Sequence, residues 1–135
     1  MLDTSVLSAI VFGEPDAEAL VALLSSREDA LCVAAPTLVE ASIVVEAKQG
    51  PEASADLARL LSAFAVETIP FDATQAAIAA AAWRRFGKGR HPAALNLGDC
   101  FSYAAARALG AALAFKGDDF LQTDIEAIAP GGLGH

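Results

Sequence analysis

Short apolar runs alternate with longer stretches that carry helical spacing. The short apolar segments lie at residues 1–7, 30–34, 66–71, 111–115 and 125–128. Their lengths and flanks favour buried strands. The first run resembles the end of a strand that continues into a loop and a helix, and the last run is typical of an edge strand.

Helix start and stop signals divide the stretches between these runs. Asp16 and Asp72 suit N-cap positions, Pro51 suits a first helical turn, and Gly110 suits a helix end. The predicted helices cover about residues 17–26, 36–48, 51–65, 73–86 and 96–109. Strands that alternate with helices predict an α/β layer fold with a mostly parallel sheet.

The length of 135 residues and the hydrophobic content of 55% indicate one folded domain. We place this domain at residues 1–129 and expect residues 130–135 to form a flexible C-terminal tail. No apolar stretch is long enough to cross a membrane, and nothing resembles a signal peptide. The 2 cysteines are too few for a disulfide scaffold. A cytoplasmic location is the simplest interpretation.

The formal net charge of −8 argues against general coating of nucleic acids, which needs a basic surface. It leaves open a site where a metal ion and a local basic patch overcome the repulsion. Such a patch lies at the end of the predicted helix 73–86 and in the loop after it. No acidic residue occurs between Asp72 and Asp99. Its members are Arg84, Arg85, Lys88, Arg90 and His91. They either stabilise a helix end through its dipole or guide phosphate groups.

Acidic residues follow several predicted strands, at the edge where parallel strands end and where ligands bind in such sheets. Asp3 follows the first run, and Glu40 lies on the helix after the second run. Asp99 begins the helix before the fourth run, and the doublet Asp118-Asp119 follows that run. Together they predict one cluster of carboxylates.

Each acid also has an ordinary structural interpretation. Asp3 can cap a helix, and Asp99 can complement a helix dipole. Thr37 and Glu40 fit the spacing of a capping box, and the acidic doublet fits a turn. Carboxylates gathered at one edge would repel each other and raise one another's pKa values, which a divalent cation resolves. Mg²⁺ or Mn²⁺ bound there suits hydrolysis of a phosphodiester.

With these residues in view, the sequence resembles the PIN-domain ribonucleases, and specifically the VapC toxins of VapBC toxin–antitoxin pairs. The matching segments are Leu2–Leu7, Leu38–Ala41, Gly87–His91, Leu95–Ala104 and Phe115–Phe120, followed by Thr123-Asp124. They occur in the family's order and span nearly the whole chain. The Gly-Asp-Cys-Phe-Ser-Tyr-Ala and Phe-Lys-Gly-x-Asp-Phe strings are the most specific. Only Met1 and Leu2 precede Asp3, whereas the family has a longer first strand.

The resemblance implies a three-layer α/β/α sandwich with a central, mostly parallel sheet, and a homodimer. It implies a ribonuclease dependent on Mg²⁺ or Mn²⁺, which is inhibited by a VapB-like antitoxin that covers the acidic groove. By analogy, Asp3 and Asp99 bind the metal and Glu40 orients or deprotonates the attacking water. Asp119 binds the metal directly or through water, and Asp118 is its alternative. The RNA target stays open between transfer, ribosomal and messenger RNA.

Two other functions compete with this interpretation. A PIN-like module could hold antitoxin or RNA without cleaving it. A Rossmann-like cofactor protein is disfavoured, because no Gly-x-Gly-x-x-Gly follows the first run.

Overall fold

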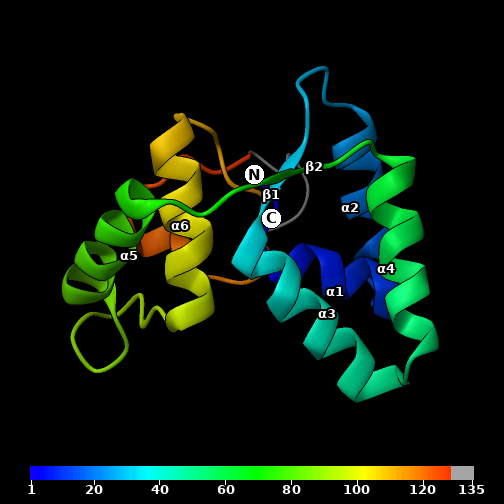
Figure 1. Cartoon of the computed structure of the whole chain (residues 1–135), viewed down its shortest axis with the longest axis horizontal. Coiled ribbons are helices and arrows are strands. Elements are labelled where there is room, and N and C mark those ends of the chain that lie inside the picture. The colour runs from blue at the N-terminus through cyan, green and yellow to red at the C-terminus, as the bar shows by residue number, and fades with distance from the viewer. Residues whose placement is uncertain (129–135) are drawn as a thin grey trace.

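The structure is a computed structural model that describes residues 1–128. The helices are α1 (Thr4–Phe12), α2 (Ala17–Ser25), α3 (Ala35–Gln49), α4 (Glu52–Ala63), α5 (Ala73–Phe86) and α6 (Leu97–Leu109). The strands are β1 (Cys32–Ala34) and β2 (Glu67–Ile69), and a short 3₁₀ helix, η1, covers Asp119–Gln122 (Figure 1). The predicted tail at residues 130–135 lies outside the described residues, so the proposed domain boundary stays a prediction.

Parallel strands form the centre of the molecule. β1 and β2 pair in parallel, with Cys32 opposite Glu67. Backbone hydrogen bonds extend this pair, because the Leu2 N–H donates to the Cys32 carbonyl at 2.8 Å and the Asp3 N–H donates to the Ala114 carbonyl at 3.0 Å. A parallel bridge from Leu113 to Ala127 adds the last segment. The first residues of the chain therefore lie in the middle of a parallel sheet.

Regular strand pairing is shorter than the apolar runs predict. Outside β1 and β2, the described residues pair through isolated bridges, which include Leu2 with Ala114 and Leu113 with Ala127. The predicted loop after the first run is also wrong, because α1 begins at Thr4. The Asp3 carboxylate accepts the Ser5 N–H and starts the helix at once. The run therefore contributes only two or three sheet residues.

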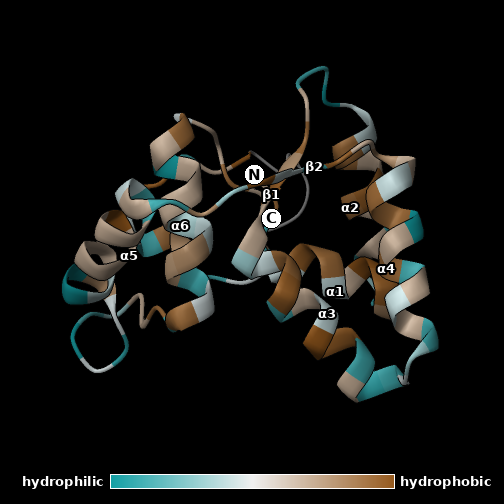
Figure 2. Ribbon diagram, viewed as in Figure 1, coloured by the Kyte–Doolittle hydropathy of each residue, from teal (hydrophilic) through white to brown (hydrophobic). Residues whose placement is uncertain are grey.

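Helices cover both faces of the sheet, as the three-layer prediction requires. Neighbouring strand residues point to opposite faces, so Met1 and Leu113 pack in one apolar cluster while Leu2 and Ala114 pack in another. Residues of α5 and α6 complete the first cluster, and residues of α1, α2, α3 and α4 complete the second. Figures 1 and 2 show these two groups of helices on either side of the strands, with apolar residues facing inward.

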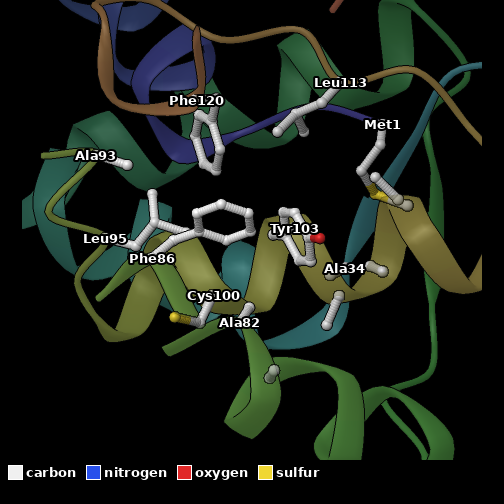
Figure 3. Packing of buried hydrophobic residues seen from close by; sticks show 14 residues of the cluster. Met1, Ala34, Ala82, Phe86, Ala93, Leu95, Cys100, Tyr103, Leu113 and Phe120 are labelled. Atoms are coloured by element: carbon white, nitrogen blue, oxygen red, sulfur yellow. The ribbon is translucent and has the colours of Figure 1, made fainter. Parts of the chain in front are cut away.

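Aromatic rings fill the cluster under α5 and α6. Phe86 and Tyr103 are buried, with ring centroids 5.8 Å apart, and Phe120 lies close to them (Figure 3). Cys100 is also buried there, whereas Cys32 is only half-buried. Phe86 and Tyr103 are therefore core residues.

Several helix ends follow the sequence signals. The Asp72 carboxylate accepts the Gln75 N–H at 2.9 Å and caps α5, and Gly110 ends α6 in the left-handed region with φ 61°. Asp16 occupies the N-cap position of α2 without bonding to its backbone. Its carboxylate instead pairs with the Lys116 ammonium at 3.1 Å. No helix in the described part of the chain is long and apolar enough to cross a membrane.

Candidate active site

The predicted acids gather beyond the carboxyl ends of the parallel segments. Asp3 precedes α1, Glu40 lies in the second turn of α3, Asp99 lies in the first turn of α6, and Asp119 begins η1. Figure 1 shows the starts of α3 and α6 approaching each other below the strands, close to α1. Helices from opposite faces of the sheet meet there.

Asp3 is the most enclosed of these acids, with 4% of its surface exposed. One carboxylate oxygen, Oδ1, accepts the Ser102 hydroxyl at 2.6 Å. The other, Oδ2, accepts the Ser5 hydroxyl at 2.6 Å and the Ser5 N–H at 3.1 Å. The predicted cap is therefore confirmed, but α6 also orients the same carboxylate. Three donors compensate the loss of water around this buried side chain.

Glu40 lies between α1 and α6. Its carboxylate accepts a hydrogen bond from the Thr4 hydroxyl. It also lies directly against the α carbon of Gly98, where a Cβ atom would fall 1.9 Å from the Glu40 Oε2. A Cβ atom at position 98 would force the Glu40 carboxylate to move, since real Cβ atoms essentially never show contacts under 3.0 Å.

The capping-box alternative for Thr37 and Glu40 is wrong. The N-cap of α3 is Ala34, and Pro36 lies in the first turn. Thr37 is fully buried, and its hydroxyl forms a hydrogen bond with Ser102 at 3.2 Å. Glu40 therefore does not cap α3, and its side chain faces the start of α6.

Asp99 forms a capping box with Asn96. The Asn96 N–H donates to the Asp99 carboxylate at 3.0 Å, and the Asp99 N–H donates to the Asn96 side chain at 2.9 Å. Burial is the largest reason why the pKa of Asp99 rises from 3.8 to about 7. The bond from Asn96 opposes the rise, and the charges of Asp3, Asp119 and Glu40 add to it. The structural interpretation is thus confirmed, and Asp99 also lies within the field of the other acids.

Asp119 is exposed and lies at the first position of η1, directly after Asp118. The charge of Asp119 contributes to the raised pKa of Asp99, whereas Asp118 is not among the contributing charges. This effect supports Asp119, and the choice between Asp119 and Asp118 as the fourth acid stays a prediction.

The types of side chain at this site suit a divalent cation, but the distances between them do not. Within residues 1–128, no three carboxylate, imidazole or thiol groups lie close enough together to hold one metal ion. The donors, however, are all carboxylates, which hard cations prefer. The raised pKa of Asp99 also reflects negative charge that a cation would neutralise. The metal-binding roles of Asp3, Asp99 and Asp119 therefore stay predictions.

The basic patch lies at the end of α5 and in the loop after it. Arg84, Lys88 and Arg90 are exposed, and the Arg90 guanidinium lies 4.3 Å from the centre of the Trp83 ring. Arg85 is exposed too, and its guanidinium pairs with Asp124 at 3.2 Å. These contacts leave at least part of the predicted patch accessible to phosphates.

His91 is held within the patch by local contacts. Its Nδ1 accepts the Ala93 N–H at 3.0 Å, and its ring packs edge-on against Phe86. The Nδ1 atom of His91 is therefore occupied by a hydrogen bond within the loop and is not available to a ligand.

An apolar groove beside Glu40 was missed at the level of sequence. It lies between α3 and α6, has a volume of about 400 Å³, and is lined mainly by apolar side chains. The exposed fractions are 58% for Val39, 62% for Ile43 and 70% for Leu97. A second apolar groove of about 460 Å³ lies between α5 and α6 and shares Leu97 and Phe101 with the first. The signal in the sequence was that α3 carries apolar residues on more than its buried face.

Comparison with known proteins agrees with this architecture. Residues 1–126 match the PIN domain family. The chain is 43% identical over 129 residues to "VapC ribonuclease Mb0640" of Mycobacterium bovis, covering 96% of this chain and 98% of that protein. It is 41% identical over 128 residues to "Ribonuclease VapC" of Mycolicibacterium smegmatis, covering 95% and 98%.

A solved structure supports the same fold. The crystal structure of Mycobacterium tuberculosis VapC20, described as a sarcin-ricin loop cleaving toxin, superposes with a TM-score of 0.77. The match covers 92% of this chain and 94% of that chain, at 17% sequence identity.

Proposed function

Because the chain belongs to the PIN-domain family, and to the VapC ribonucleases within it, we propose that it is the endoribonuclease toxin of a type II toxin–antitoxin pair. Its reaction is the hydrolysis of RNA phosphodiester bonds with Mg²⁺ or Mn²⁺. The observation that carries the proposal is the environment of Asp99: burial is the largest reason why its pKa rises to about 7, and the charges of Asp3, Asp119 and Glu40 add to the rise. Acids from distant segments therefore share one electrostatic site.

The acids take different roles in this reaction. When bound, Mg²⁺ or Mn²⁺ lowers the pKa of a coordinated water and stabilises charge on the phosphate and the leaving oxygen. Asp3 and Asp99 are the proposed direct ligands, and Asp119 binds directly or through water. Glu40, held by Thr4 and placed against Gly98, orients the attacking water and accepts its proton.

The exposed cations guide the RNA towards this site. The chain carries a net charge of −8, so unassisted binding of a polyanion is unfavourable. Arg84, Lys88 and Arg90 supply a local positive surface, and the loop that contains two of them leads into the first turn of α6, where Asp99 lies. Phosphate contacts of this kind fix position rather than sequence.

A VapB-like antitoxin is the proposed inhibitor. The apolar groove lined by Val39, Ile43 and Leu97 also includes Glu40. A partner segment with apolar side chains and a neighbouring Arg or Lys would bury that surface and pair with the carboxylates. The protein itself is proposed to act as a homodimer in the cytoplasm, with light scattering on the purified chain as the test of the dimer.

The cleavage assay uses purified protein without antitoxin, a structured RNA and Mg²⁺ or Mn²⁺. Cleavage should stop with EDTA and return when the metal is restored. Asp99→Asn keeps the shape of the side chain and removes its charge, so it should abolish cleavage while the protein remains folded. Cleavage that persists in Asp99→Asn, or that ignores EDTA, would contradict the proposal.

A second function, a binding module without turnover, is favoured by one observation. In the described residues no three potential ligands are close enough to share a metal ion. Such a module would retain RNA or antitoxin and show no metal-dependent cleavage in the same assay.

A further inference from the structure

Two buried hydroxyl groups connect α3 and α6 behind the acidic site. Thr37 and Ser102 are both fully buried, and their oxygen atoms lie 3.2 Å apart. Ser102 also contacts the Asp3 carboxylate, with 2.6 Å between Oγ and Oδ1. Three consecutive polar groups therefore form a chain through a region that is otherwise apolar.

The direction of this chain follows from the number of hydrogens available. An ionised carboxylate only accepts, and a serine hydroxyl carries one hydrogen. Since Ser102 donates its hydrogen to Asp3, it accepts the hydrogen of Thr37. Thr37 therefore donates to Ser102 and Ser102 donates to Asp3.

The other oxygen of Asp3 is held from the opposite side. Ser5 donates to Oδ2 through both its hydroxyl and its N–H. The Ser5 hydroxyl in turn accepts the Lys116 N–H at 3.0 Å. Both oxygens of Asp3 thus have fixed donors, and the side chain has little freedom to rotate.

We propose that Thr37 and Ser102 are positioning residues that orient Asp3 towards the bound cation. This inference rests on the function proposed above. Neither hydroxyl reaches the RNA, because both are completely buried. Groups that hydrogen-bond to a metal ligand fix its direction, and their removal typically lowers metal affinity or activity by about 10–100-fold.

Thr37 allows a matched pair of substitutions. Thr37→Val keeps the branched shape and removes the hydroxyl, whereas Thr37→Ser keeps the hydroxyl and removes a methyl group. Ser102→Ala removes the central donor directly. The readouts are the apparent affinity for Mn²⁺, measured by calorimetry without RNA, the kcat and KM of cleavage, and the melting temperature of the metal-free protein.

We expect Thr37→Val to weaken Mn²⁺ binding and to lower kcat by about tenfold, with KM unchanged. Ser102→Ala should lower Mn²⁺ affinity and kcat by at least as much. Thr37→Ser should stay near wild type in Mn²⁺ affinity and kcat, even though the lost methyl group lowers its melting temperature.

The outcomes separate the two proposals. Equal Mn²⁺ affinity and kcat in Thr37→Val and Thr37→Ser, in folded proteins, overturn the positioning role and leave the nuclease intact. A wild-type protein that neither binds Mn²⁺ nor cleaves RNA overturns the nuclease, and the positioning role with it.

Discussion

The carboxylate of Glu40 occupies the space that a side chain at position 98 would need. A Cβ atom at Gly98 would lie 1.9 Å from Oε2 and 2.5 Å from the carboxyl carbon of Glu40. The first turn of α6 therefore packs directly against the end of the Glu40 side chain of α3. This contact brings Glu40 beside Asp99, the next residue along α6.

Gly98→Ala tests this approach. The added methyl group should push the Glu40 carboxylate away and lower RNA cleavage by about 100-fold, as small misplacements in an active site do. Alanine is also a better helix former by about 1 kcal/mol, so urea unfolding should show little loss of stability. Glu40→Gln serves as the comparison.

The double variant decides the interpretation. If Gly98 acts through Glu40, Gly98→Ala combined with Glu40→Gln should be no slower than the slower single variant. Fully additive losses would show that Gly98 acts by another route.

The raised pKa of Asp99 predicts how stability depends on pH. The carboxyl group ionises near pH 3.8 in the unfolded chain and near 7 in the folded protein without metal. Between these values the folded state binds more protons, so this group makes the protein less stable as the pH rises. Asp99→Asn should therefore stabilise the metal-free protein at pH 8 relative to pH 4.

Thermal melts across pH 4 to pH 8 measure this effect as the difference between wild type and Asp99→Asn. Asp118→Asn, an exposed neighbour of the site, is the control and should follow the wild-type curve. A pH-independent difference between wild type and Asp99→Asn would contradict the assignment.

Substitutions of Asp118 and Asp119 should have different effects on RNA cleavage. The charge of Asp119 is among the main causes of the raised pKa of Asp99, whereas the charge of Asp118 is not. Asp119→Asn should therefore lower cleavage by about tenfold or more, while Asp118→Asn should change it less than twofold. Both are exposed, so urea unfolding should be similar. The opposite order of effects would make Asp118 the fourth acid.

The cations of α5 and its loop should contribute unequally to RNA binding. Combined replacement of Arg84, Arg85 and Arg90 by Ala should weaken binding and flatten its salt dependence. Each lost phosphate contact reduces the slope of log K against log salt by about 0.7 for single strands. Because Arg85 pairs with Asp124, Arg85→Ala alone should change the slope less than Arg90→Ala.

Binding titrations at several salt concentrations measure these slopes, with a catalytically inactive Asp99→Asn background to prevent cleavage. Arg59→Ala on α4 is the matched control, since Arg59 is exposed and pairs with Asp56. Slopes that stay unchanged in the triple variant would remove the patch from RNA recognition.

Asp124 belongs to a structural cluster at the end of α6. It accepts the Tyr103 hydroxyl, and this bond is the largest reason that its pKa is lowered. Arg85 and Arg107 lie 3.2 and 3.9 Å from the same carboxylate. Tyr103→Phe should lower the free energy of unfolding by about 1 kcal/mol. Unchanged kcat in this variant would agree with a purely structural role.

Local signals were sufficient for the helices and for much of the site. Asp72, Asn96 and Gly110 delimit α5 and α6 as their residue types predict. Asp3, Glu40 and Asp119 follow strand ends and Asp99 begins a helix, so the rule for parallel sheets predicts that they lie at one edge, and their roles there stay predictions. The extent of the strands was overestimated because apolar runs do not reveal how few residues find a pairing partner.

The polar contacts behind the acids could not be found in this way. Thr37 fits a capping box with Glu40 by its spacing, and only the packing of α3 against α6 turns it towards Ser102. The Ser5 hydroxyl donates to Asp3 and accepts the Lys116 N–H, and the second of these bonds likewise joins residues far apart in the chain. Such contacts arise from tertiary packing and leave no local pattern.

The central place of the first residues in the sheet bears on how the protein is made. Asp3 depends on Ser102, 99 positions later, and Ser5 depends on Lys116, 111 positions later. During synthesis, Asp3 and Ser5 lack these hydrogen-bond partners until the ribosome has added Ser102 and Lys116. Contacts of such long range form late. The surroundings of Asp3 are therefore among the last parts of the fold to assemble, and they are completed only when synthesis is almost finished.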